Sequence, residues 1–63
     1  MPTSKDIEGW IEAVQEEIDA RREKFTPWEL TFISSISEQF DRTGYLTQAQ
    51  VETLERVYAN KTS

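Results

Sequence analysis

Apolar residues recur every three or four positions through the first third of the chain, the spacing at which side chains share one face of an α-helix. This pattern predicts a long first helix over residues 4–24. Residues 1–5 are expected to form a frayed leader in which Thr3 or Ser4 caps the helix. Acidic residues in its first turns and basic residues at its end suit the helix dipole. The apolar stripe comprises Ile7, Trp10, Ile11, Val14 and Ile18.

A second helical pattern begins after Phe25-Thr26-Pro27, which interrupts the first because proline cannot continue a helix. Thr26 is expected to act as the N-cap and Glu29 as its partner in a capping box. We expect this helix over residues 27–43, with Gly44 in the left-handed conformation that often ends helices. Its apolar positions are Trp28, Phe32, Ile33, Ile36 and Phe40, and its opposite face carries Thr31, Ser34, Ser35 and Glu38.

The third helical pattern begins at Thr47, which can form a second capping box with Gln50, while Leu46 and Val51 match a hydrophobic staple. It predicts a helix over residues 48–60, followed by loose residues 61–63. Because the connections are short, successive helices should pack as neighbours. The sequence therefore predicts a single all-α, three-helix domain over residues 1–63, with a long N-terminal helix followed by a helix–turn–helix pair. The third apolar stripe comprises Val51, Leu54, Val57 and Tyr58.

The length of 63 residues is near the lower limit for a domain with one apolar core. Twelve acidic and seven basic residues give a net charge of −5, which disfavours direct binding to nucleic acid or to an anionic membrane. No apolar run approaches the roughly 20 residues of a membrane span, and the first residues lack a signal-peptide pattern. We therefore expect a cytoplasmic protein.

The absence of histidine and cysteine restricts the chemistry open to this chain. Imidazole is the usual proton carrier near neutral pH, and cysteine is a strong nucleophile and a common zinc ligand. Nucleophile–imidazole pairs, structural zinc sites and disulfides are therefore excluded. Three short helices also rarely enclose the pocket in which paired carboxylates act as acid and base. We expect no enzymatic activity, no cofactor and no metal.

The segment from Asp41 to Gln50 has a faint similarity to a calcium-binding loop, with Gly44 at the turn position. In this alignment Gln39, Asp41 and Thr43 occupy the first ligand positions, and Gln50 stands where a bidentate glutamate is required. One carboxylate thus remains among four ligand positions. A helix–turn–helix corner explains the same residues better.

Four acidic residues of the first helix, Glu8, Glu12, Glu16 and Asp19, fall within about an 80° arc of the helical wheel. Three of them are four residues apart, where like charges repel by a few tenths of a kcal/mol per pair. A row of carboxylates with about 6 Å of rise between members can imitate phosphates in front of a basic, nucleic-acid-binding surface. The alternative is an ordinary solvated face.

Beside these carboxylates, Gly9, Ala13 and Ala20 form a strip of small residues that lets a second helix approach closely. Together with Trp10 and the rest of the apolar stripe, they widen the non-polar arc to about 200°, roughly twice what an edge helix requires. The first helix is therefore either a homo-oligomer interface or the central helix of its own chain. Among the aromatic residues, which often anchor interfaces, Tyr45 in its glycine turn is the best candidate for an exposed contact.

The stretch Trp28-x-x-x-Phe32 … Gly44-x-Leu46-Thr47-x-x-Gln50-x-x-x-Leu54-x-x-Val57-Tyr58 resembles a short helical segment of phage and bacterial proteins. In that segment a tryptophan–phenylalanine helix precedes the pattern L-[ST]-x-x-Q-x-x-x-L-x-x-[IV]. The resemblance covers about half of the chain, from Trp28 to Lys61, and brings no catalytic residue with it. In size and charge, the chain is also similar in kind to phage-encoded inhibitors of host enzymes and defence systems.

These observations favour a non-enzymatic protein-binding module, of the phage-inhibitor type, that docks its acidic helix face on a basic surface of a host protein. A first alternative is a self-assembling helical module whose first helix forms a homo-oligomer. A second alternative, which the segment resemblance implies, is an accessory protein of DNA replication or repair. The net charge favours a protein over DNA as the partner there.

Overall fold

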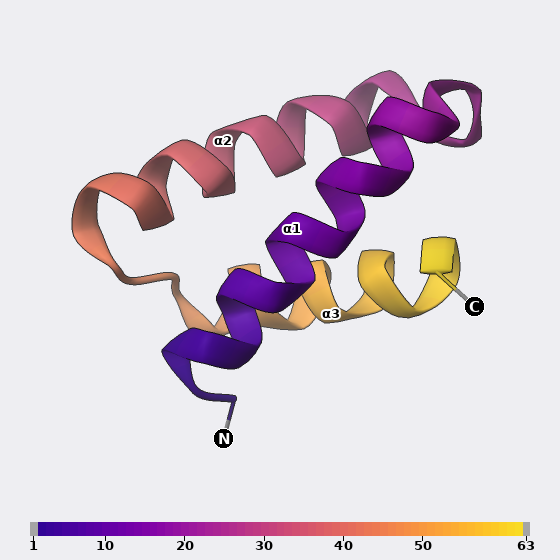
Figure 1. Cartoon of the computed structure of the whole chain (residues 1–63). Coiled ribbons are helices and arrows are strands. Elements are labelled where there is room, and N and C mark those ends of the chain that lie inside the picture. The colour runs from indigo at the N-terminus through magenta and orange to yellow at the C-terminus, as the bar shows by residue number, and fades with distance from the viewer. Residues whose placement is uncertain (1, 63) are drawn as a thin grey trace.

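Three helices form the structure, a computed structural model that describes residues 2–62 (Figure 1). They are α1 (Ser4–Ala20), α2 (Pro27–Thr43) and α3 (Gln48–Thr62), and a short 3₁₀ turn, η1 (Arg22–Lys24), follows α1. No strand occurs within the described residues. The predicted all-α, three-helix fold is confirmed.

The start of α1 is fixed by Thr3 rather than Ser4. The Thr3 hydroxyl accepts a hydrogen bond from the Asp6 backbone N–H at 3.2 Å, and the Thr3 N–H donates to the Asp6 carboxylate at 3.0 Å. This capping box satisfies two N–H groups that lack partners in the first turn. Ser4 and Lys5 are consequently helical, and the prediction of a frayed leader is wrong for them. Met1 lies outside the described residues.

The end of α1 comes at Ala20, four residues before the predicted end at residue 24. Arg21 leaves the helical conformation with φ −143° and ψ 61°, and the chain then turns through η1. After this exit Phe25 lies in the core, where it is 7% exposed. The predicted pairing of basic residues with the helix dipole is therefore wrong, because no basic residue lies in the last turn of α1.

Both ends of α2 match the sequence prediction. Thr26 and Glu29 form the reciprocal capping box at 3.1 and 2.8 Å, with Pro27 in the first turn. Gly44 ends the helix at φ 70°, a left-handed conformation that glycine adopts without steric cost. Its N–H donates to the Phe40 carbonyl at 2.7 Å.

The corner between α2 and α3 is held by side-chain amides. Thr47 and Gln50 form the predicted capping box at 3.2 and 2.9 Å. Gln50 and Gln39 also exchange two amide hydrogen bonds of 3.1 Å each, which link the end of α2 to the start of α3. At its other end α3 continues to Thr62, so the prediction of loose residues is wrong for Lys61 and Thr62. Ser63 lies outside the described residues.

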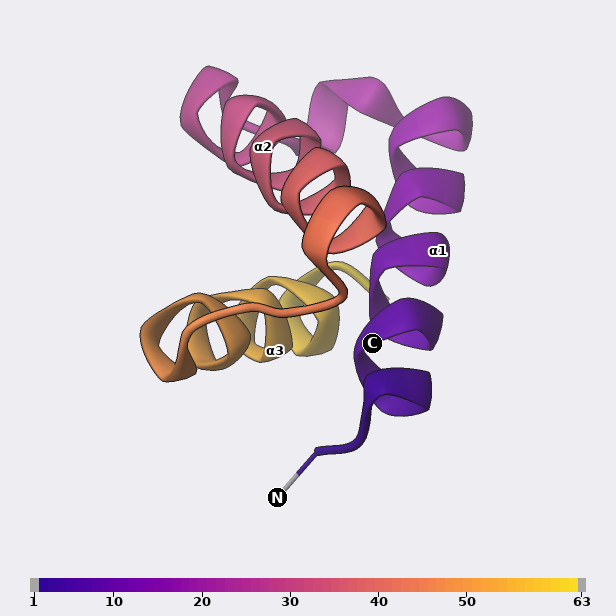
Figure 2. The same ribbon diagram turned by 90° about the vertical axis from the view of Figure 1, so that its left-hand side faces the viewer.

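The core lies where α1 crosses the other two helices (Figures 1 and 2). α1 covers one side of the α2–α3 pair and contacts both helices, α3 more extensively than α2. None of the helices in residues 2–62 combines the length and apolar character that a membrane crossing requires. The buried side chains are Ile7, Ile11, Val14, Phe25, Ile33, Ile36, Leu46, Leu54 and Val57.

Candidate acidic docking face

The four predicted carboxylates of α1 lie on its outer side, and we call them the acidic face: Glu8, Glu12, Glu16 and Asp19. All four residues are exposed, because the opposite side of α1 holds the core residues Ile7 and Val14. Their helical spacing places them on the flank that leads from the outer surface toward α2. The structure therefore presents these carboxylates to solvent as one continuous row.

The acidic face, like most carboxylates of the described residues, has no cationic partner, and it differs from them in having four carboxylates in one row along a helix. Within residues 2–62, Glu17 forms ion pairs with Arg21 at 3.7 Å and with Lys24 at 3.3 Å, and Glu29 pairs with Lys61 at 3.4 Å. None of the four acidic-face residues takes part in an ion pair in this part of the chain.

A groove between α1 and α2 adjoins one half of the acidic face. Glu8 and Glu12 of α1 and Asp41 of α2 line it, together with the apolar side chains of Ile11 and Phe40. Such a groove suits the side chain of arginine or lysine, whose aliphatic stem packs on apolar atoms while its charged head meets carboxylates.

A hydrogen bond separates this groove from the rest of the α1–α2 seam, since the Gln15 amide donates to the Ser37 hydroxyl at 2.8 Å. Beyond it, Asp19 lines a second depression that also includes Arg22 of η1. Glu16 lines neither depression. The structure thus places Glu8 and Glu12 together at a groove, and Asp19 at a separate depression that Arg22 also lines.

Tyr45 is 64% exposed, as the sequence predicted, and projects from the α2–α3 corner. Its backbone carbonyl accepts hydrogen bonds from Gln39 and Thr43, each at 3.2 Å, so the corner is well ordered by local bonds. Tyr45 lines a depression that shares Ser4 and Gly44 with the acidic groove. It therefore lies near the Glu8 end of the acidic face.

The small-residue strip has a mixed environment. Gly9 and Ala20 are exposed, Ala13 is half-buried, and a Cβ atom placed on Gly9 would meet no other atom within 4 Å. Trp10, in contrast, packs against Tyr58 of α3, with ring centroids 6.0 Å apart. Because α1 contacts both other helices, much of its wide apolar arc is used inside the chain.

The residues of the segment that is similar to a calcium-binding loop form hydrogen bonds with one another at the α2–α3 corner. The side chains of Gln39 and Gln50 bond to each other, and the Thr43 hydroxyl donates to the Gln39 carbonyl at 2.9 Å. Asp41 points instead to the α1–α2 groove. In the described part of the chain, no group of three His, Cys, Asp or Glu side chains is arranged to hold a metal ion.

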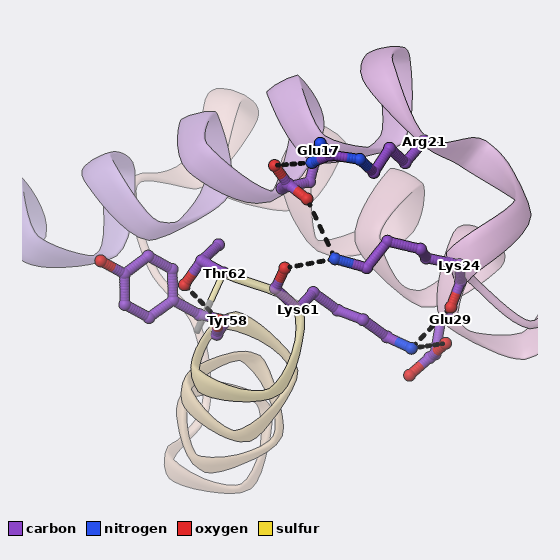
Figure 3. Close-up of polar contacts among 7 residues, drawn as sticks. All are labelled: Glu17, Arg21, Lys24, Glu29, Tyr58, Lys61 and Thr62. Atoms are coloured by element: carbon purple, nitrogen blue, oxygen red, sulfur yellow. Dashed lines mark hydrogen bonds and ion pairs between the residues drawn. The ribbon is translucent and has the colours of Figure 1, made fainter.

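A polar cluster that the sequence analysis did not identify joins the ends of the three helices (Figure 3). The Lys61 ammonium donates to the Lys24 carbonyl at 2.6 Å, and the Lys24 ammonium donates to the Lys61 carbonyl at 3.0 Å. Lys61 also lies 5.2 Å from the centre of the Phe25 ring. These partners are 37 residues apart, and no local pattern marks such a pairing.

Electrostatics at this cluster affect Glu29. The backbone N–H of Thr26, followed by the hydrogen bond and charge of Lys61, holds the pKa of the Glu29 carboxyl below its usual value, although partial burial opposes this shift. Glu29 therefore stabilises the folded state in its ionised form. The cluster therefore stabilises the fold, whereas the acidic face is exposed to solvent.

Trp28 is also placed differently from the sequence prediction. It belongs to the expected apolar stripe of α2, yet it is 59% exposed and stacks on Phe32 with centroids 5.1 Å apart and planes 7° from parallel. It lines a groove with Val57 and Asn60 of α3 instead of entering the core.

No family model, curated protein or solved structure matches this chain.

Proposed function

We propose that this chain is a non-enzymatic protein-binding module whose acidic face docks on a basic surface of another protein. The observation that carries the proposal is the row of four exposed carboxylates along one side of α1, none of which has an ion pair among the described residues. Glu17 and Glu29 have basic partners within the chain, whereas the acidic face has none among the described residues. A basic partner would supply the missing counter-charges.

Energetics support this role. Like charges at successive turns of a helix oppose folding by a few tenths of a kcal/mol per pair, so the row of Glu8, Glu12 and Glu16 weakens the isolated domain slightly. Contact with a basic surface converts the same row into favourable interactions. The uncompensated charge also steers a basic partner toward α1 and raises the rate of association at low salt.

The groove beside Glu8 and Glu12 allows the module to distinguish one basic partner from another. Ile11 and Phe40 supply apolar contact area, and Asp41 supplies a third carboxylate from the neighbouring helix. Arginine is the favoured occupant because its guanidinium can bond two carboxylate oxygens at once. A partner with an arginine on its basic surface would therefore bind more tightly than one with scattered lysines.

A row of carboxylates that covers a basic, nucleic-acid-binding surface competes with the nucleic acid for it. The module would then act as an inhibitor of that partner. The expected signature is mutual exclusion, in which DNA displaces the module from the partner and raising the salt concentration weakens both complexes.

The test is neutralisation of the acidic face by Glu8→Gln, Glu12→Gln, Glu16→Gln and Asp19→Asn in one variant. A matched control variant carries four neutralisations elsewhere: Glu23→Gln, Glu38→Gln, Glu52→Gln and Glu55→Gln. Both variants are titrated against a panel of basic DNA-binding proteins. We expect at least a tenfold loss of affinity from the first variant only, about 1.4 kcal/mol. Equal affinities of the two variants would contradict the proposal.

A further inference from the structure

A second groove lies at the corner between α2 and α3, beside the first turn of α1 (Figure 1). Three apolar side chains line it: Ile7 of α1, Leu46 of the link between α2 and α3, and Val51 of α3. The exposed Tyr45 lines it as well. We call this depression the corner groove. Its volume is about 440 Å³, so it has room for a large side chain of another molecule.

The side chain of Tyr45 is available to a partner. Its backbone takes part in the hydrogen bonds of the corner, but within residues 2–62 neither a hydrogen bond nor a ring contact holds the phenol itself. Tyrosine offers an apolar ring with a polar tip and is enriched where interfaces gain most of their affinity. Tyr45 therefore adds contact area to the corner groove without being needed in the core.

The corner groove adjoins the acidic groove, which Glu8, Glu12 and Asp41 line. Both depressions include Ser4 and Gly44. Because these two residues are small, no bulky side chain separates the grooves where they meet. A single segment of a partner can consequently occupy both.

The charges around the two grooves are negative. Among the described residues, no lysine or arginine lines either groove. Glu52 and Glu55 line the corner groove, but they share another depression with Arg56, a cation that competes for them. The carboxylates of the acidic groove come from two helices and have no such cation beside them. A basic side chain therefore fits the acidic groove best, and an apolar side chain fits the corner groove.

We propose that the two grooves together bind one segment of the partner protein, in which an arginine occupies the acidic groove and a nearby leucine or other large apolar residue occupies the corner groove. This inference rests on the proposed function and specifies the chemistry of its partner. The arginine supplies charge complementarity. The apolar side chain adds a contact that depends on burial and not on charge.

The probes are two synthetic peptides of equal length and charge. In the first, a leucine is flanked on each side by three arginines, so that arginines stand at several distances from it. In the second, asparagine replaces the leucine. Isothermal titration calorimetry should show that the wild type binds the leucine peptide at least about fivefold more tightly, because its apolar side chain is buried in the corner groove. Both affinities should fall as salt is raised, whereas their ratio should stay constant. Equal affinities would overturn the proposal.

A pair of matched variants locates the leucine. Tyr45→Ser should abolish most of the preference for the leucine peptide. Trp28→Ser, which changes a similarly exposed aromatic residue outside both grooves, should retain it. Circular dichroism checks that both variants are helical. A preference that Tyr45→Ser leaves unchanged, or that Trp28→Ser removes, would contradict the assignment to the corner groove.

A second measurement needs no variant. In methyl NMR spectra of the wild type, the signals of Ile7, Leu46 and Val51 should shift with the leucine peptide and not with the asparagine peptide. Absence of these shifts would overturn the proposal. Shifts that follow protein concentration without any peptide would assign the groove to a second copy of the chain and would also contradict it.

The acidic-face variant separates this inference from the proposed function. Neutralisation of Glu8, Glu12, Glu16 and Asp19 should weaken the binding of both peptides by the same factor and leave their ratio unchanged. If that loss occurs and the leucine peptide has no advantage, the inference alone fails. If neutralisation does not weaken the asparagine peptide, the proposed function fails, and the assignment of the arginine fails with it. If neither peptide binds, both are contradicted.

Discussion

Carboxylates have opposite surroundings on the acidic face of α1 and in the cluster at the helix ends. At the cluster, Glu17 and Glu29 lie among the ammonium groups of Lys24 and Lys61, which also bond to backbone carbonyls. On the acidic face, four carboxylates stand in a row with no ion pair among the described residues. The cluster stabilises the fold, whereas the acidic face is available for a partner.

Among the changes that test this contrast, loss of Lys61 should lower the free energy of unfolding most. Lys61→Ala removes the ion pair with Glu29, the bond to the Lys24 carbonyl and the contact with the Phe25 ring, and it leaves a half-buried carboxylate without its cation. We expect a loss of about 2 kcal/mol in the free energy of unfolding, measured in urea. Arg22→Ala, an exposed cation without an ion pair among the described residues, should change it by less than about 0.5 kcal/mol. Equal effects would contradict a special role for the cluster.

Alanine at the two glycines should act in opposite directions. Gly44 has a φ of 70°, which is strained for any residue with a Cβ, so Gly44→Ala should destabilise the domain by about 1 kcal/mol. Gly9 is exposed within α1, with open space around its Cα, and Gly9→Ala should stabilise the domain by up to about 1 kcal/mol. Thermal unfolding measures both variants. The same sign for both would contradict the assigned backbone conformations.

Acid should weaken the cluster through Glu29. Its pKa is lower in the folded state than the usual 4.5, so the folded state favours the ionised form. This stabilisation is complete above the unfolded value and is lost as the pH falls through the lower folded value. We expect the melting temperature of Glu29→Gln, which retains the capping geometry, to fall less steeply with acid than that of the wild type. Parallel profiles would show that Glu29 does not contribute to the acid sensitivity.

Single neutralisations should produce the smallest effects and the clearest difference in sign. Glu12→Gln relieves repulsion from Glu8 and Glu16 and should raise the free energy of unfolding by a few tenths of a kcal/mol. Glu17→Gln removes contacts with Arg21 and Lys24 and should lower it by a similar amount. Urea titrations of both variants show whether each substitution raises or lowers the free energy of unfolding. A loss of stability from Glu12→Gln would indicate a partner for the acidic face inside the chain.

The sequence predicted those features that depend on nearby residues. These features are the capping boxes at the starts of α2 and α3, the glycine turn and the apolar stripes. Each depends on residues within four positions of one another, so local hydrogen bonding or helical spacing specifies it directly. The exposure of the acidic face follows from the same spacing, and that of Tyr45 from its place in the turn between α2 and α3. Local chemistry thus fixed most of the fold.

The features that the sequence did not reveal depend on packing between distant segments. The end of α1 at Ala20 follows from the burial of Phe25, which requires knowledge of where the core lies. The Lys24–Lys61 contacts join residues 37 positions apart. Trp28 lies in an apolar stripe and yet is exposed, because it stands at the edge of that stripe and lines the α2–α3 groove rather than the core. Periodicity shows which face is apolar but not how far a neighbouring helix covers it.

The most direct test of the acidic face is an NMR titration of isotopically labelled protein with a short oligoarginine peptide, which supplies guanidinium groups without a fold of its own. We expect amide shift changes to concentrate at Glu8, Glu12 and Glu16 and at Phe40 and Asp41 around the adjoining groove, and to disappear at high salt. Changes spread evenly over all exposed carboxylates, Glu23, Glu52 and Glu55 included, would contradict a defined docking face on α1.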